Sequence, residues 1–389
     1  MQEKRQRILK MLEEGTISMD EALTLLENLH ENDLEDNQHK MADDHKKKTP
    51  SELLPPIRKK QEEKTHTDQE EEESSMDDFL NDLRKDFTVV GDRFMQFMQS
   101  AVQKVKDFDF DVPFGQSATF NHTMTRSAEG IEEVLVKVSN GKIAIHRSDD
   151  DEIRAEFSVK AFNQNSEEEA KINFLDKMLF ATDGEKLRLS SEMKMFQVNT
   201  DLYLPHKAYQ RLAVKLTNGS FKMKESNFDR IRVKTANGRI EASQFVFKDS
   251  DFETANGAIY LNDATGNTLE AETLNGRIYI DGQLKEVEAQ SLNGHVTVTT
   301  RSEEAEKIDA KTLSGTVELY IPSTLSISGE LSSSVGKLDL GLDDVEKITE
   351  QDQIFQRNIR FRKEVAGQTR KLHLTGEAKS GTVLVRYNV

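Results

Sequence analysis

The chain has 389 residues, of which 35% are hydrophobic and 32% are charged, so part of it must be solvated and not packed in a core. Its formal net charge of −17 argues against nucleic acid and anionic lipid as partners of the whole molecule. The absence of cysteine excludes disulfides, thiolate catalysis and cysteine-ligated zinc sites.

Cellular location is read from the apolar runs. Charged residues interrupt every such run in the opening stretch MQEKRQRILKMLEEG, so no secretory signal is recognised there. Farther along, no apolar stretch is long enough to span a bilayer. We therefore expect a cytoplasmic protein, and the alternative is one that also contacts the inner face of the membrane.

Residues 1–30 predict a helical hairpin. Gly15 is placed to end the first helix, where a left-handed residue is favoured. Ser18 and Glu21 form a capping box that begins the second helix. Two helices this short bury too little surface to be stable alone, so we expect them to pair with another copy or another protein.

Residues 31–75 predict a charged linker. This stretch has almost no large apolar residues and contains Pro55, Pro56 and the acidic run Glu70–Glu73. A segment of this composition cannot bury enough apolar surface to fold, and its charges favour extended conformations.

Residues 76–110 predict a long amphipathic helix. Its apolar residues recur at alternating steps of three and four, which is the pattern of a coiled-coil seam. Acidic residues lead the segment, and Lys104 and Lys106 close it, as the helix dipole prefers. Three interpretations stay open: a coiled coil, a cap on the end of the repeat domain, and a helix in a membrane interface. The candidate oligomer or membrane stripe is Leu80, Leu83, Phe87, Val90, Phe94 and Phe97.

The most informative feature of the sequence is a repeated Asn-Gly pair, which Ser314–Gly315 continues at the end. Successive pairs are 19, 19, 19, 18 and 21 residues apart, and they begin at Asn218, Asn237, Asn256, Asn275, Asn293 and Ser314. The flanks repeat as well. The residue three positions after each of these is apolar, in the order Phe221, Ile240, Ile259, Ile278, Val296 and Val317.

This register predicts a stack of coils, each made of a strand, a sharp turn and a second strand. A hairpin is the usual interpretation of Asn-Gly, but hairpins in a meander do not require a fixed period near 20. Stacking would align the Asn amides in a hydrogen-bonded column, and Gly would allow a positive φ at each corner. A Thr column two residues before the Asn, at Thr235, Thr254 and Thr273, would act similarly.

The predicted domain is a β-solenoid over residues 120–389. Residues 120–213 follow the same pattern, with VLVKVSNGKIAI as an early coil and an excursion between Asn163 and Phe174. Residues 343–371 interrupt the other end, and LHLTGEAKSGTVLVRYNV is expected to close it. Because solenoid ends must block edge pairing, the helix of residues 76–110 and this insertion are the expected caps.

No motif for catalysis, phosphate binding or metal binding is found. Some parallel β-helices cleave polysaccharides with carboxylate clusters, and Asp249, Asp251 and Asp263 are the candidates for such chemistry. They do not occupy matching positions on adjacent coils, and tryptophan, a usual sugar platform, is absent. We therefore expect no catalytic residue, no cofactor and no metal.

One outward face predicts a binding surface. The positions two and four residues after each corner Asn point away from the core, and neighbouring coils lie about 4.8 Å apart. Stacked tyrosines flanked by arginines on such a face would suit a ligand or a protein, and an ordinary solvated face is the alternative. The candidate residues are Arg239, Tyr260, Arg277, Tyr279 and His295.

These coils, with the preceding segment Asp201–Pro205, resemble the bacterial "putative adhesin" β-solenoid domain of YvlB-like and LiaG-like proteins of Firmicutes. The hairpin containing Glu13–Leu23 is similar to the SHOCT-like bihelical module that often precedes this domain. The resemblance covers residues 1–30 and 120–389. It implies a right-handed, single-stranded parallel β-helix of about 19–20 residues per coil. It also implies a place in cell-envelope stress operons, and it carries no catalytic residues.

Together these observations predict a mainly β scaffold or interaction protein of the bacterial cell-envelope stress response. It would be non-enzymatic, would self-associate as a homo-oligomer and would bind protein partners, membrane-embedded stress proteins among them, but no nucleic acid. The alternative from another class is a surface adhesin, or a β-helix that binds or cleaves polysaccharide. A third hypothesis is a structural protein that assembles through the ends of the solenoid.

Overall fold

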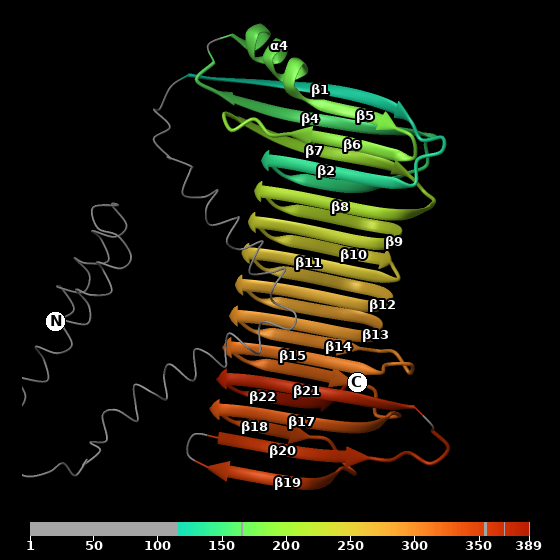
Figure 1. The fold of residues 1–389 in the computed structure, drawn as a ribbon, viewed down its shortest axis with the longest axis vertical. Coiled ribbons are helices and arrows are strands. Elements are labelled where there is room, and N and C mark those ends of the chain that lie inside the picture. The colour runs from blue at the N-terminus through green and yellow to red at the C-terminus, as the bar shows by residue number, and fades with distance from the viewer. Residues whose placement is uncertain (1–115, 165, 354–355, 369, 389) are drawn as a thin grey trace, which may run out of the picture. The chain divides into compact units, whose positions relative to one another are not determined.

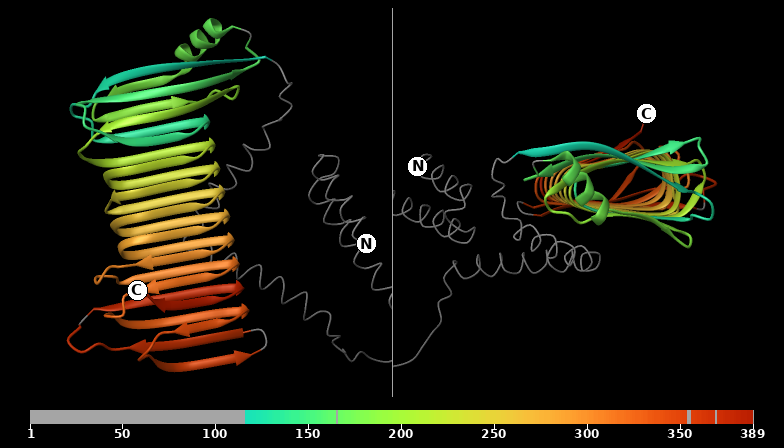
Figure 2. Two further views of the ribbon diagram at one scale, coloured as in Figure 1. Left: turned by 180° about the vertical axis from the view of Figure 1, so that it is seen from behind. Right: turned by 90° about the horizontal axis from the view of Figure 1, so that it is seen from above.

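The computed structural model describes residues 116–164, 166–353, 356–368 and 370–388. The predicted hairpin (1–30), linker (31–75) and amphipathic helix (76–110) lie outside the described residues. The described residues form stacked coils with a flattened cross-section, so that each coil adds one strand to each of two facing walls (Figure 1; Figure 2). The predicted β-solenoid is therefore confirmed.

The central coils alternate a pre-corner strand, which ends at the Asn or Ser corner, with a post-corner strand, which follows it. Three long strands, β9, β12 and β13, contain the post-corner strand of one coil and the pre-corner strand of the next. Neighbouring coils pair in parallel, and Asn237, Asn256, Asn275 and Asn293 stand in one register column. The strands are β8 (Ala208–Asn218), β9 (Phe221–Asn237), β10 (Ile240–Val246), β11 (Asp249–Asn256), β12 (Ile259–Asn275), β13 (Ile278–Asn293), β14 (Val296–Thr300), β15 (Lys307–Ser314) and β16 (Val317–Ile321).

Apolar columns fill the space between the two walls. Ile240, Ile259 and Ile278 are 0% exposed and lie side by side in β10, β12 and β13. The ring of Phe245 reaches across to the opposite wall, 5.9 Å from the ring of Phe252. Burial of each such apolar side chain contributes about 1.5–3 kcal/mol to the stability of the fold. The contribution recurs in every coil because each coil packs on its neighbours.

The corner asparagines form the predicted amide column. From Asn218 through to Asn293, each Nδ2 donates to the Oδ1 of the Asn in the preceding coil, at 2.8–3.1 Å, and the column begins at the Oδ1 of Asn140. The Thr column acts differently from the prediction, because its hydroxyls bond to backbone and not along the column. Thr254 Oγ1, for example, donates to the carbonyl of Gly238 in the adjacent coil at 3.0 Å. Each corner is thus linked to the next by two side-chain hydrogen bonds, one from an Asn amide and one from a Thr hydroxyl.

The corner glycines are required by close stacking more than by their backbone angles. The prediction of a positive φ at each corner holds at Gly315 (φ +148°). It is wrong at Gly257 and Gly276, whose φ lies outside the range from +20° to +160° that favours glycine. A Cβ on Gly257 would lie 2.0 Å from the carbonyl oxygen of Gly238, which no real side chain tolerates. Glycine is needed here because stacked backbones touch.

The uneven repeat spacing has a local cause. Glu225, Gln244 and Asp263 occupy the same place in successive coils and take a left-handed backbone, with φ of 52°, 54° and 49°. The next coil lacks this extra residue, so that Leu261 and Ala264 pair with Ile280 and Gly282, and its period is 18. The interval of 21 contains the loop between β14 and β15.

The N-terminal end of the solenoid departs from parallel pairing. β1, β4 and β7 pair antiparallel, as do β5 and β6, whereas β2 and β3 pair in parallel with β8 and β9. The expected excursion after Asn163 contains a helix, α4, that lies over this end (Figure 1; Figure 2). Phe174 of α4 packs 5.6 Å from the rings of both Phe120 and Phe157. The bounds are β1 (Ser117–Ser127), β2 (Glu133–Asn140), β3 (Ile143–Ser148), β4 (Glu152–Phe162), α4 (Glu167–Lys177), β5 (Leu179–Asp183), β6 (Lys186–Ser191) and β7 (Phe196–Pro205).

The C-terminal strands do not close the solenoid, and that prediction is wrong. β21 lies between β15 and β17, and β22 lies between β16 and β18, so the last coil is inserted inside the stack. The predicted interruption instead forms the antiparallel pair β19–β20, which adds to β17 and covers the end. The bounds are β17 (Ser326–Val335), β18 (Leu338–Gly341), β19 (Glu346–Gln353), β20 (Gln356–Lys363), β21 (Lys371–Ser380) and β22 (Val383–Tyr387).

Candidate binding face

The predicted candidate residues lie on the outer surface of the post-corner wall. Tyr260 and Tyr279 are paired in β12 and β13, and their rings lie 6.5 Å apart at a tilt of 38°. The guanidinium of Arg239 lies 5.5 Å from the centre of the Tyr260 ring, in a cation–π arrangement. This surface follows from the period of two, because Ile259, Leu261, Ile278 and Ile280 point into the core.

A shallow groove of about 640 Å³ runs over this wall. Three of the five predicted residues, Tyr260, Arg277 and Tyr279, line it, whereas Arg239 and His295 do not. Arg239 instead pairs with Glu241 at 3.0 Å, and His295 Nδ1 accepts a hydrogen bond from the Thr316 backbone at 3.2 Å. The groove is also lined by Asp281, Thr297, Thr299, Arg301, Glu318, Tyr320, Tyr387 and Asn388.

Sequence reasoning missed part of this lining. Asp281 and Tyr320 stand six residues after their corners, on the same outward column, and the candidate positions extended only to the fourth residue. The period-two pattern of these strands could therefore have predicted both residues from the sequence. Tyr387 had no such signal, because it reaches the groove only through the insertion of β22 beside β16. Its hydroxyl donates to the Asp343 carbonyl at 2.9 Å and accepts from Lys363 Nζ at 2.8 Å.

Charges at one edge of the groove are paired. Arg301 contacts Asp263 at 2.8 Å and Asp281 at 3.1 Å. Burial raises the pKa of Asp281, and the nearby Arg301 opposes that shift. The groove therefore offers flat aromatic rings next to hydroxyl, amide and paired ionic groups. Such a surface can bind and orient a partner by stacking and hydrogen bonding.

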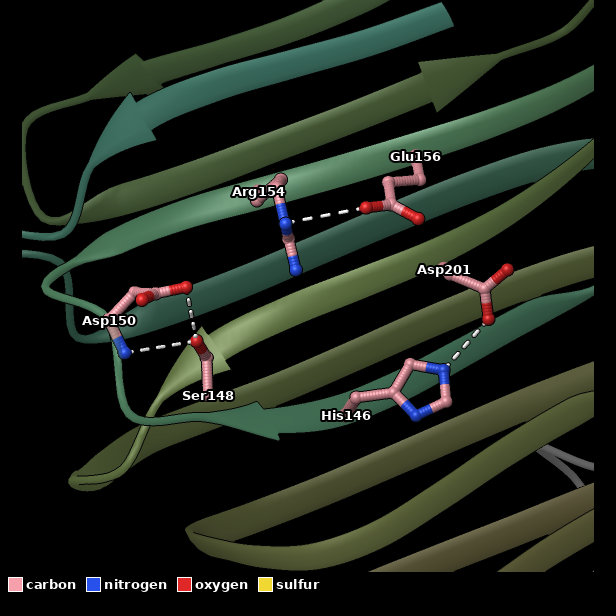
Figure 3. Close-up of polar contacts among 6 residues, drawn as sticks. All are labelled: His146, Ser148, Asp150, Arg154, Glu156 and Asp201. Carbon is pink, nitrogen blue, oxygen red and sulfur yellow. Dashed lines mark hydrogen bonds and ion pairs between the residues drawn. The ribbon is translucent and has the colours of Figure 1, made fainter. Parts of the chain in front are cut away.

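A second polar cluster lies on the same wall nearer α4. His146 Nε2 and Asp201 Oδ1 are 2.8 Å apart, and the His146 ring stacks on Tyr203 at 5.0 Å (Figure 3). Arg154 lies over the other side of Tyr203, at 4.4 Å. Ser148 is directed away from this His–Asp pair: its hydroxyl contacts Asp150 at 3.1 Å, at the turn between β3 and β4 (Figure 3). Serine, histidine and aspartate here do not form a relay for nucleophilic catalysis.

The three aspartates considered for glycan cleavage are not brought together. Asp249 and Asp251 lie on the pre-corner wall, whereas Asp263 pairs with Arg301 at the groove. Asp251 does stand in register with carboxylates at matching positions of the following coils. The column five residues before each corner reads Asp251, Glu270, Glu288 and Asp309.

Two carboxylates of the pre-corner wall are buried although they point outward. Glu253 is 4% exposed and Glu272 is 7% exposed. Burial, with the nearby Asp251, raises the pKa of Glu253 to about 7 despite its contact with Lys234. Burial, with neighbouring carboxylates, raises the pKa of Glu272 to about 8.

Two other kinds of feature are absent from the described residues. Within residues 116–388, apart from the undescribed positions, no group of three or more His, Asp or Glu side chains is arranged to hold a metal ion. In the same part of the chain, no helix has the length and apolar character needed to cross a membrane.

Comparison with known proteins places this chain in a family. The Toastrack DUF4097 model matches residues 131–369, and a SHOCT-like domain model matches residues 3–33. "Uncharacterized protein YvlB" of Bacillus subtilis (strain 168) is 34% identical over 397 residues, covering 100% of both chains.

Two solved structures are similar to the solenoid at low identity. A "putative cell adhesion protein" from Clostridium sporogenes covers 69% of this chain and 100% of its own, at 12% identity and a TM-score of 0.25. A "putative adhesin" from Bacteroides fragilis covers 69% of this chain and 97% of its own, at 9% identity and a TM-score of 0.31. On the match to the family model and the full-length relative, the chain belongs to the Toastrack DUF4097 family and carries a SHOCT-like module before its solenoid.

Proposed function

We propose that this chain is a non-enzymatic interaction protein of the bacterial cell-envelope stress response. The observation that carries the binding role is the tyrosine-lined groove around Tyr279. Tyr and Arg are enriched at the positions that contribute most to protein binding, and Tyr buries a large area with little loss of conformational entropy. The amide and glycine columns make the supporting wall rigid, so binding does not have to order it.

The partner class that we propose is protein. Membrane-embedded stress proteins are the first candidates, and a second copy of this chain is another. The assignment to envelope stress is supported by the resemblance of the coils and the hairpin to proteins found in such operons. In this proposal the protein is cytoplasmic, and the groove meets its partner at the inner face of the membrane.

The second candidate function is attachment to polysaccharide, as in an adhesin. It is favoured by the grouping of Tyr260, Tyr279 and Tyr320 with Thr and Asn side chains, since flat rings and hydroxyl partners also suit sugars. The same variants therefore have to be tested against both partner classes.

The test is photo-crosslinking in native cells. A photo-reactive amino acid placed at Thr297, which lines the groove beside Tyr279, should capture a membrane protein, with more product after treatment with a cell-wall antibiotic. Combining it with Tyr260→Ala and Tyr279→Ala should reduce capture at least about tenfold, as expected when anchor residues of an interface are removed.

The matched control is Tyr203→Ala, which removes an outward tyrosine from the same wall near α4 and should leave capture unchanged. Binding of the purified protein to isolated cell-wall polysaccharide is measured with the same variants. Tyrosine-dependent binding to polysaccharide without any captured protein would replace the interaction-protein proposal with the adhesin function.

A further inference from the structure

The strands at the two ends of the stack each have one edge without a neighbour among the described strands. Where a strand pairs on one side only, its unpaired N–H and C=O groups can pair with another chain. Four strands in the described part of the chain are in this position. They are β1 and β5 at the end that carries α4, and β18 and β19 at the other end.

Three of these four edges are blunted by short length, charge or irregular pairing. β5 has 5 residues and β18 has 4, so neither offers a long template to another strand. β19 carries Glu346, Lys347 and Glu350, and its pairing register shifts between Lys347 and Thr349. Charged side chains and bulges of this kind discourage pairing at the edge of a sheet.

The edge of β1 is not blunted in any of these ways. β1 has 11 residues without a proline, and its register with β4 is continuous from Ser117 to Ser127. Its one Lys, Arg, Asp or Glu is Arg126, whose Nη2 donates to the Phe180 carbonyl of β5 at 2.6 Å. The exposed outward side chains are small and uncharged: Ser117, Thr119, Asn121, Thr123 and Thr125. β1 is therefore a long, regular edge that is open to another strand.

An exposed apolar surface lies at the same end. Ile172 and Leu175 of α4 are 68% and 41% exposed, on the side of the helix away from the buried Ala170 and Phe174. Residues three apart on a helix are neighbours on its surface, so the two side chains form one apolar patch. Together with the open edge of β1, this patch leaves the end of the solenoid incomplete without a partner.

A second copy of this chain fits both features. β1, β4 and β7 already pair antiparallel, so β1 of a second copy can continue the wall about a two-fold axis. α4 lies over one side of this end, and the axis places the second α4 over the other side (Figure 1; Figure 2). Helices related in this way run antiparallel, which brings the acidic first turn of one α4, Glu167–Glu169, toward the last turn of the other, with Lys177.

The end of the solenoid is large enough for a stable dimer. β1 is about 36 Å long at ~3.3 Å per residue, and two packed sheets with their outer side chains are about 20 Å thick. The end thus offers roughly 700 Å² per copy, close to the ~800 Å² per partner of a stable interface. A ligand that added only one strand would use the edge of β1 but leave Ile172 and Leu175 exposed, so the second copy is the favoured occupant.

We propose that two copies of this chain associate through the open edge of β1. Each β1 pairs antiparallel with the same strand of the other copy, and the two α4 helices pack against each other beside the axis. Because β18 and β19 at the far ends are blunted, the dimer is closed and does not extend into a fibre. The inference is independent of the proposed function, because the tyrosine groove lies over β12 to β16 and β22, toward the other end.

Distances between spin labels test this arrangement directly. The full chain contains no cysteine, so one introduced cysteine gives one label per copy. The label-to-label distance should pass through a minimum along β1 and grow by up to about 13 Å for each two-residue step, since the two strands rise ~3.3 Å per residue in opposite directions. The matched control is Thr349→Cys on β19, at the opposite end, where no short distance should be measured. The labelled variants are Thr119→Cys, Asn121→Cys, Thr123→Cys and Thr125→Cys.

Charge placed on the edge tests whether β1 holds the dimer. Asn121→Lys with Thr123→Lys puts like charges opposite one another, and should raise the dissociation constant of the full-length dimer at least about tenfold in sedimentation experiments. Thr349→Lys with Gln351→Lys makes the same change of charge on β19 and should leave that constant unchanged. Circular dichroism confirms that each variant retains its strands.

The apolar patch is tested without altering β1. Ile172→Gln with Leu175→Gln should weaken the dimer several-fold, because the two side chains are buried only in the dimer.

Three results would overturn the proposal. A full chain that sediments as a monomer would leave the edge of β1 to another occupant. A dimer that tolerates both lysines in β1 would be held by another part of the chain. Short label distances on β19 as well as on β1 would show assembly through both ends, in place of a closed dimer.

Discussion

A side chain's place in a coil decides its chemistry in this protein. Before the corner Asn, every second position enters the core, so Thr254 binds a carbonyl inside whereas Glu253 beside it faces out, and after the corner the parity is reversed. The same count places Glu272 against Glu253 and Glu270 against Asp251, in adjacent coils. Strict stacking therefore brings like charges about one strand spacing apart, and burial strengthens their effect.

Glu272 predicts a pH dependence of stability. Because its pKa is raised to about 8 in the folded protein, the folded state keeps a proton that the unfolded chain releases above pH about 4.5. The contribution to stability is complete below that pH and is lost as pH rises toward about 8. Glu272→Gln should therefore raise the free energy of unfolding at pH 8.5 by about 1–3 kcal/mol, measured in urea.

The control for this measurement is Glu286→Gln, an exposed carboxylate on the same face. It should leave the pH dependence of the unfolding free energy as in the parent protein. The explanation fails if Glu272→Gln and the parent lose stability equally between pH 5 and pH 8.5.

At the scale of elements, the ends of the solenoid differ from its interior. Interior strands are parallel and bury both of their edges, but a terminal strand leaves one edge open to pairing with other chains. Here α4 and antiparallel strands lie at one end, and β19–β20 lies at the other. The last coil, β21 and β22, is an interior element although it comes last in the chain.

Removal of residues 371–389 should therefore be severely destabilising. It takes away an interior coil whose Leu372, Leu374, Val383 and Val385 are 0–1% exposed, which is about 6–12 kcal/mol of burial. It also leaves β15 and β17 without the strand that joins them. Thermal unfolding should show a much lower midpoint, and limited proteolysis should release β17–β20.

A deletion of residues 346–363 is the matched control, because it removes terminal strands and not an interior coil. It should keep the interior coils folded while exposing the edge of β17, seen as increased aggregation. An unchanged melting temperature for the 371–389 truncation would contradict the inserted position of β21 and β22.

The described solenoid behaves as a one-dimensional array at the scale of the whole molecule. Each coil contacts mainly the coils on either side, so its stability is a sum of coil and neighbour terms. A complete coil should then be removable if the register is kept. Deleting Ile240–Ala258 joins Arg239 to Ile259, and it preserves the spacing of the columns because it removes one full period of 19 residues.

We expect this variant to fold, with a modestly lower unfolding midpoint and the same strand content by circular dichroism. Deleting Ile240–Ala255 instead removes 16 residues and brings Asn256 directly after Arg239, out of register. That variant should aggregate or be digested rapidly, because a shifted register turns core side chains toward water. Equal behaviour of the two deletions would show that the columns do not set the fold.

The sequence by itself determined the coils of this protein. The spacing from Asn218 to Ser314, the apolar positions around it and the amide column are all local or nearest-neighbour properties. They could be predicted because the position of a residue that stacks on its equivalent depends only on the neighbouring coils, and not on distant parts of the chain. Tyr260, Arg277 and Tyr279 were found on the groove for the same reason.

Only the tertiary structure decided how the stack ends and which residues complete the groove. The insertion of β22 beside β16 brings Tyr387 to the groove, and the packing of Phe174 of α4 on Phe120 covers the far end. Both depend on which strand edges and apolar surfaces are left open once the central coils have formed. The repeat pattern therefore does not predict which edges are paired or covered, because open edges belong to the assembled stack and not to any single repeat.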